Sequence, residues 1–219
     1  FSALALVVRG LQVLLLCATR AGGGILALEV GGAMALVDQE YLVPGTTLPA
    51  EAVLETVTIN GITHLIATGA NQAGVLAYAL AADGTLATPR QLPGSLAGTI
   101  AAQTVLQAEG STFFYAARPG ESAIHGYAVA ADGTMTRIGT KVLDGPHVGL
   151  DISALTPVTV AGNRFLVSLS MDADVVRAFP VGANGVLGNA QFIGAPQGLG
   201  MAEPSAVSVV ELAGLTYLV

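Results

Sequence analysis

The chain has 219 residues, of which 53% are hydrophobic and 11% charged, and its formal net charge is −7. So few basic residues argue against a nucleic-acid partner, because nucleic-acid binding normally shows a basic patch. The single cysteine, Cys17, excludes an intrachain disulfide and a cysteine-rich metal cluster. Near the N-terminus, the apolar residues 11–19 stand between Arg9 and Arg20 and are too short for a spanning helix of about 20 residues, so we expect no membrane span.

Turn dipeptides divide the chain into repeats of about fifty residues. They are Gly31-Gly32, Asp83-Gly84, Asp132-Gly133 and Asn184-Gly185. An earlier turn glycine recurs with the same period, at Gly10, Gly61, Gly110, Gly162 and Gly214. Two sets of turns with one period, joined by short apolar segments, predict an all-β fold of the β-propeller type.

The third repeat shows the expected strands most clearly. Residues 104–108 and 112–116 are predicted as its first two strands, and residues 123–130 and 135–142 as the last two. Short turns with glycine join these segments, as in antiparallel hairpins. Each repeat is therefore predicted to form a four-stranded antiparallel blade.

We predict a single β-propeller domain over residues 1–219, with about four and a half blades. The blades are expected at about 1–48, 49–97, 98–149 and 150–202, with a partial blade at 203–219. The chain begins with Phe1 and ends on an apolar strand, whose open edge natural sheets normally cover. We therefore expect a fragment of a seven-bladed ring. The remaining blades, a protein partner or self-association through the C-terminal edge would cover that edge.

One large side chain recurs in the third strand of the repeats. It stands six residues before the hairpin glycine, as Leu26, Tyr78, Tyr127 and Phe179. Large rings that recur once per repeat are far more common in cores than in ligand sites. We predict that these four side chains pack between blades.

Three long segments share one pattern: an aromatic-rich or apolar strand, a polar loop, a strand with a central aromatic residue, and a turn with glycine. They are residues 64–92, 113–139 and 165–188, the second reading FFYAARPGESAIHGYAVAADGTMTRIG. This pattern resembles the repeat of the lactonase-like seven-bladed propellers, the 6-phosphogluconolactonase or YVTN type. The YVTN tetrapeptide itself is absent, and FYAA and LVSL stand in its place. The resemblance implies the propeller fold, and for activity the opening of sugar-acid lactones by charged residues at the channel mouth.

A column of oxygen-bearing residues precedes the first strands of the repeats, where propeller loops line the channel mouth. Glu51, Asp151 and Glu203 occupy this column, with Thr99 in the third repeat. Converging carboxylates suit a hard cation such as Ca²⁺ or Mg²⁺, so we predict a metal site there. Crowded carboxylates would also provide a general base for lactone hydrolysis. His147, which lies close to Asp151 in sequence, and Thr99 are further candidates for ligand binding.

Two functions remain open from the sequence. The first is a non-enzymatic binding or scaffold module of a larger secreted protein. Low lysine content and an acidic balance resemble secreted bacterial proteins with calcium-binding hemolysin-type (RTX) repeats, although no such nonapeptide occurs here. The second is a lactonase-like hydrolase that acts on a sugar lactone. We expect secretion for the first, and a cytoplasmic location is the alternative.

Overall fold

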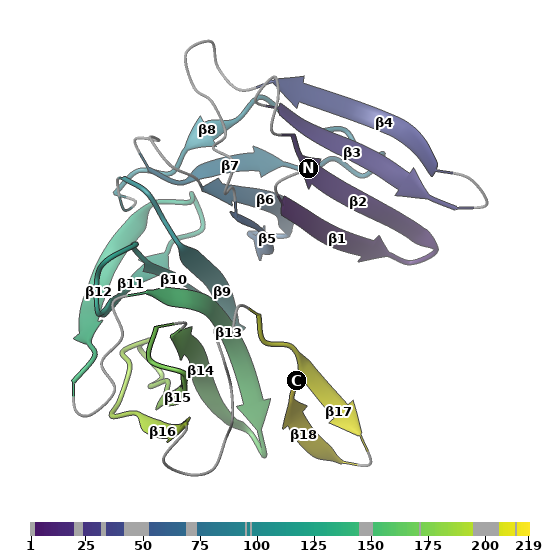
Figure 1. Ribbon diagram of the computed structural model, residues 1–219. Helices are drawn as coiled ribbons and strands as arrows, with labels where there is room; N and C mark the ends of the chain where they lie inside the picture. The colour runs from purple at the N-terminus through teal and green to yellow at the C-terminus, as the bar shows by residue number, and fades with distance from the viewer. Residues whose placement is uncertain are drawn as a thin grey trace. The chain divides into compact units, whose positions relative to one another are not determined.

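The structure is a computed structural model that describes residues 3–19, 24–31, 34–41, 53–68, 74–94, 96, 98–144, 151–170, 172–194, 206–212 and 214–219. Within these ranges the ordered elements are strands and there is no helix (Figure 1), which confirms the predicted all-β class. Accordingly, none of the described segments forms a long apolar helix that could cross a membrane.

The strands form four four-stranded meanders and one two-stranded sheet. The first sheet holds β1 (Ala3–Arg9), β2 (Gln12–Ala18), β3 (Gly24–Val30) and β4 (Met34–Tyr41). The second holds β5 (Val53–Ile59), β6 (Ile62–Thr68), β7 (Leu76–Ala79) and β8 (Arg90–Gln91). The third holds β9 (Ala102–Ala108), β10 (Ser111–Ala117), β11 (Ala123–Val129) and β12 (Met135–Val142). The fourth holds β13 (Ile152–Val160), β14 (Asn163–Ser170), β15 (Val175–Pro180) and β16 (Gln191–Gly194), and the last holds β17 (Val209–Leu212) and β18 (Leu215–Leu218).

These sheets have the four-stranded antiparallel form of propeller blades, as predicted. The chain divides into two compact units. One contains Phe1–Ile100 together with Val129–Thr136, and the other contains Ala101–Ala128 together with Arg137–Val219. The expectation of one domain over residues 1–219 stays a prediction.

In the first unit, the β1–β4 and β5–β8 sheets pack face to face. Leu14, Leu16 and Ile25 of the first sheet share a core with Leu65 and Tyr78 of the second. We call the side of a blade that carries the equivalents of Leu65 and Tyr78 its front face, and the opposite side its back face. The front face of β5–β8 thus lies on the back face of β1–β4.

The second unit repeats this arrangement. Leu166 and Phe179, on the front face of β13–β16, share a core with Phe113, Tyr115 and Ile124 on the back face of β9–β12. A sheet that is covered on both faces needs apolar side chains at successive positions. Strand β10 shows this pattern, since its successive residues Phe113 to Ala117 are all buried.

A hairpin glycine of one blade fits against the preceding blade. In the first unit, a Cβ added to Gly84 would lie 3.1 Å from both Leu14 Cδ2 and Val37 Cγ1. In the second unit, a Cβ on Gly185 would lie 2.6 Å from Phe113 Cε1. Both glycines also have positive φ, +92° and +78°. The recurring glycine therefore meets two demands at once, a left-handed turn and a close approach between sheets.

In three repeats, the residue before the hairpin glycine closes the turn with its side chain. Asp83 Oδ1 accepts hydrogen bonds from the backbone N–H and the hydroxyl of Thr85, at 3.0 and 2.7 Å. Asp132 Oδ1 accepts one from the N–H of Thr134 at 2.9 Å, and Asn184 Oδ1 one from the N–H of Val186 at 3.2 Å. These short local bonds explain the preference for Asp and Asn at this place.

In the first repeat, the strands are shifted by one residue relative to an alignment of the repeats on their turn glycines. In the turn Asn60-Gly61 both residues have positive φ, whereas in Gly10-Leu11 only the glycine does. Glycine is the second residue of the Asn60-Gly61 turn but the first residue of the Gly10-Leu11 turn. The turn glycine therefore does not mark the same position in every repeat.

The shift changes one core assignment. Tyr78 pairs with Leu65, and its counterpart in the first blade is Leu28, which pairs with Leu15. Leu26 was predicted for this place, but the register assigns it to Leu28 and pairs Leu26 with Cys17; both leucine side chains are half-buried. Tyr78, Tyr127 and Phe179 are buried, which confirms their assignment to the core.

Candidate functional site

Charged side chains of the second unit gather at one end of its sheets. In an antiparallel meander, the loop after the second strand and the segment after the fourth strand lie at the same end. The β10–β11 loop and Asp144, which follows β12, therefore share an end of the third sheet. In the fourth sheet this end carries Asp151, before β13, and the β14–β15 loop with Asp172. We call Asp144, Asp151, Asp172 and Arg177 the acidic edge.

Asp151 joins the two sheets at this end. Its Oδ1 accepts a hydrogen bond from the backbone N–H of Gly120 at 3.2 Å, and its own N–H donates to Asp172 Oδ1 at 3.4 Å. The Asp151 side chain remains exposed. It is therefore held in place by the backbone while it stays accessible to a ligand.

Arg177 is the buried member of the acidic edge. It lies on β15, is 3% exposed, and its Nη1 donates to Ser170 Oγ at 3.2 Å. Burial lowers the pKa of its guanidinium, while the negative charges of Asp172 and Asp144 act in the opposite direction. A buried arginine needs such carboxylates nearby, since an uncompensated charge is costly in a protein interior.

The sequence did present a signal for Arg177 that our sequence analysis missed. The residue interrupts an apolar third strand, Val175–Pro180. The register pairs it with Ser168, whose hydroxyl is buried and has no hydrogen-bond partner among the described residues. Arg177 and Ser168 are thus a polar pair on the front face, where the second blade carries Leu76 and Ala67.

A second polar group lies on the β10–β11 loop and the neighbouring strands. Glu121 Oε1 lies 3.3 Å from Arg118 Nη1, and Glu121 Oε2 lies 2.8 Å from His125 Nε2. The other ring nitrogen of His125 lies 3.2 Å from Thr140 Oγ1. The hydrogen bond with His125, and then Arg118, hold the pKa of Glu121 below its usual range. General acids at neutral pH need a raised carboxyl pKa, so Glu121 does not suit that role.

The predicted column of site residues is described only in part. Asp151 stands at the acidic edge, and Thr99 is half-buried in the other compact unit. Glu51, Glu203 and His147 lie outside the described residues. The predicted convergence of these residues, and their binding of Ca²⁺ or Mg²⁺, therefore stay predictions.

The described residues do not by themselves present a metal centre. Nowhere among them do three or more His, Cys, Asp or Glu side chains cluster in a way that would hold an ion. At the acidic edge, Asp151 Oδ1 faces a backbone N–H, and Arg177 supplies positive charge. The acidic edge therefore combines exposed hydrogen-bond acceptors with one buried positive charge.

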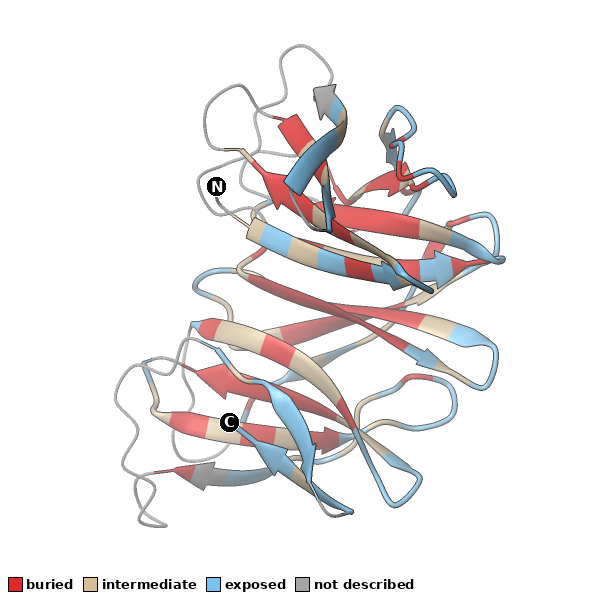
Figure 2. Ribbon diagram, turned by 90° about the vertical axis from the view of Figure 1, so that its right-hand side faces the viewer, coloured by how far each residue is buried: buried red, intermediate tan, exposed pale blue. Residues whose placement is uncertain are grey.

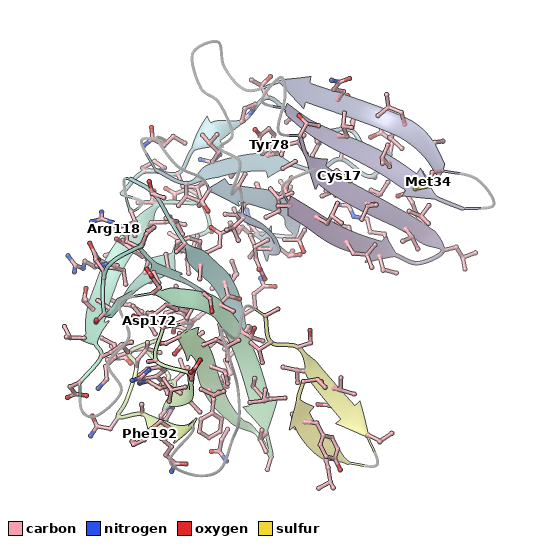
Figure 3. All side chains as sticks on the ribbon, in the orientation of Figure 1. Cys17, Met34, Tyr78, Arg118, Asp172 and Phe192 are labelled. Atoms are coloured by element: carbon pink, nitrogen blue, oxygen red, sulfur yellow. The ribbon has the colours of Figure 1, made fainter. Side chains whose placement is uncertain are left out.

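A small cavity lies elsewhere in the second unit. It measures about 60 Å³, and Ile124, Gly126 and Leu187 line it together with the polar Thr140 and Lys141. Ligand sites for small molecules typically measure about 300–1,000 Å³. The cavity is therefore a gap between packed sheets, and the acidic edge is the better candidate. Figure 3 labels Asp172 of this edge, and Arg118 of the neighbouring polar group.

Comparisons with known proteins identify solved structures of similar fold. No family model matches the chain, and no curated protein sequence matches it. A protein from Bacteroides uniformis, provisionally assigned as a 6-phosphogluconolactonase, matches 88% of this chain with a TM-score of 0.62 and 16% identity. An exo-β-1,3-galactanase from Phanerochaete chrysosporium matches 86% with a TM-score of 0.58 and 10% identity. A β-xylosidase matches 84% with a TM-score of 0.59 and 12% identity.

The match covers only part of these proteins. The chain spans 49% of the galactanase, 56% of the Bacteroides protein and 72% of the xylosidase. At such low identity the likeness concerns the fold and not the activity. The chain is thus built from the four-stranded blades of a β-propeller.

Proposed function

We propose that this chain is a non-catalytic binding module of the β-propeller type, and that its acidic edge holds a hydroxyl-rich ligand of the saccharide class. The observation that carries this proposal is the buried guanidinium of Arg177 beside the exposed carboxylates of Asp172 and Asp144. Exposed carboxylates accept hydrogen bonds from hydroxyl groups, and the positive charge of the buried guanidinium lies beside them. Several exposed acceptors at one edge suit a polyol, whose hydroxyl groups are donors.

Charge favours a neutral ligand over an anion. The acidic edge has one guanidinium and three carboxylates, and the whole chain has a net charge of −7. An anionic ligand would be repelled by this field, whereas a neutral saccharide would not. The enzymes of similar fold, a galactanase and a xylosidase, support the choice of saccharide probes.

Binding can be tested by isothermal titration calorimetry with β-1,3-galactotriose, xylotriose and a sugar-acid lactone as separate probes. We expect at least one probe to bind, and Asp172→Asn to weaken that binding by about tenfold, the equivalent of about 1.4 kcal/mol. Glu211→Gln, on β17, is the matched control, because its carboxylate is exposed outside the acidic edge. Failure of every probe to bind would contradict the proposal.

Turnover separates this proposal from the hydrolase alternative. Incubation of each probe with the wild-type chain, followed by chromatography of the products, should show no cleavage. Ring opening of the lactone that is lost in Asp172→Asn would instead support the lactonase-like reading and overturn the non-catalytic one.

A further inference from the structure

The front face of the β1–β4 sheet is apolar and exposed. Leu4, Leu6 and Val8 of β1 are 57%, 57% and 62% exposed, and Met34 and Leu36 of β4 are 68% and 59% exposed. Alternation along the strands places Arg9, Glu29 and Asp38 on the other face. An antiparallel sheet that faces water normally carries polar residues on that side. This face is therefore suited to packing against another surface.

The repeat shows what kind of surface covers a front face. The register makes Leu15 and Leu28 the counterparts of Leu65 and Tyr78. Those two side chains are fully buried against the back face of the preceding sheet. The same contact recurs in the second unit, with Leu166 as the counterpart. In both units, the occupant of a front face is the back face of another sheet.

A back face of this kind is exposed on the β17–β18 sheet. The pairs Val210–Tyr217 and Leu212–Leu215 share this face, and their side chains are 45%, 46%, 65% and 59% exposed. Glu211 points to the other side, with its partner Thr216. Figure 2 shows both strands of this sheet, next to the C-terminus, in the pale blue of exposed residues almost throughout.

We infer that two copies of this chain associate head to tail, with the back face of β17–β18 in one copy docked on the front face of β1–β4 in another. Both faces are uncharged, so their contact removes apolar surface from water without burying an unpaired charge. Most of the exposed large apolar side chains of the described residues lie in these two sheets. Because the two faces differ, the interface is heterologous, and each copy offers one of each.

The experiment uses one variant for each face. Leu6→Glu places a charge on the front face, and Leu215→Glu places one on the back face of β17–β18. Sedimentation velocity over a concentration series should show that the wild-type chain associates and that each variant alone is monomeric. An equimolar mixture of the two variants should form a dimer, since one intact front face and one intact back face remain available.

Val142→Glu is the matched control, because Val142 is 63% exposed on β12, outside both faces. It should associate like the wild type. Circular dichroism and thermal melting of every variant establish that it is folded. The concentration series should reach about 100 μM, which is a hundred times a micromolar dissociation constant. A wild-type chain that stays monomeric at this concentration would overturn the inference. So would a mixture of folded variants that stays monomeric.

Discussion

The hydroxyl of Tyr115 donates a 2.7 Å hydrogen bond to the carbonyl oxygen of Gly185. This bond ties the second strand of one sheet to the hairpin of the next, in the second unit. The same hairpin brings Gly185 against the ring of Phe113. One glycine therefore accepts a hydrogen bond, forms a left-handed turn and permits close packing.

We expect Gly185→Ala to destabilise the fold far more than Gly162→Ala. Both glycines have a φ of +78°, but nothing lies within 4 Å of a Cβ at Gly162, whereas Phe113 Cε1 and Ile138 Cδ1 would lie at 2.6 and 2.7 Å at Gly185. The control should lose about 1–2 kcal/mol of unfolding free energy from backbone strain. Gly185→Ala should lose a further 1–3 kcal/mol or so from overpacking. Urea unfolding of both variants measures the difference, and equal losses would refute the packing role.

Tyr115 should make the protein sensitive to alkali. Burial raises the pKa of its hydroxyl above the usual range. Above pH 10 or so, the unfolded chain would release this proton while the folded chain keeps it, so the free energy of unfolding falls by about 1.4 kcal/mol per pH unit. Below that pH the contribution is fully present.

Tyr115→Phe tests this pH dependence. The variant should lose about 1 kcal/mol at neutral pH, because the Gly185 carbonyl loses its partner. It should also lose less stability than the wild type between about pH 10 and 11.5. Unfolding curves at both pH values give the comparison, and parallel losses in the two proteins would contradict the assignment.

Glu121 should contribute stability that disappears in acid. Its lowered pKa arises from His125 first and from Arg118 next. The contribution is present above the unfolded pKa of about 4.3 and is lost as the pH falls through the lower, folded value. Glu121→Gln should therefore show a weaker loss of melting temperature between about pH 5 and pH 3 than the wild type. Identical acid profiles would show that this pair contributes nothing to stability.

Asp38 joins the two sheets of the first unit in the same way as Tyr115 does in the second. Its Oδ2 accepts a 2.6 Å hydrogen bond from the backbone N–H of Leu86, next to the Asp83-Gly84 hairpin. Asp38→Ala should cost about 1.5–3 kcal/mol, the usual range for a bond to a charged group. Asp38→Asn keeps an acceptor oxygen and should cost less. Chemical denaturation measures the loss of unfolding free energy in the two variants. Equal losses would show that the negative charge of Asp38, and not its acceptor oxygen, stabilises the contact.

The sequence predicted the fold more fully than the site. The repeat period and the residue types of the turns are local features of the sequence. The glycine pattern and the strands of the third repeat could therefore be recognised without knowledge of tertiary contacts. The one-residue shift in the first repeat was missed, because Gly10 and Gly61 occupy different positions of their turns.

The candidate site depends on contacts between loops that are far apart in sequence. Asp151 was recognised by its place before a first strand, but its bonds to Gly120 and Asp172 depend on how two sheets meet. Arg177 was missed because a charged residue within an apolar strand is normally expected to point to solvent. Its burial follows from the pairing with Ser168 on a covered face.

The contact between a hairpin glycine and the preceding sheet has a consequence for how such chains change in evolution. In both units, one blade supplies the hairpin that reaches backward, and the preceding blade supplies the face that receives it. In the second unit these are Gly185 and Phe113. A gene duplication or deletion of one whole period would therefore leave every junction with matching partners, whereas a change of half a period would not. The number of blades is free to vary in steps of one, while the chemistry of each junction stays the same.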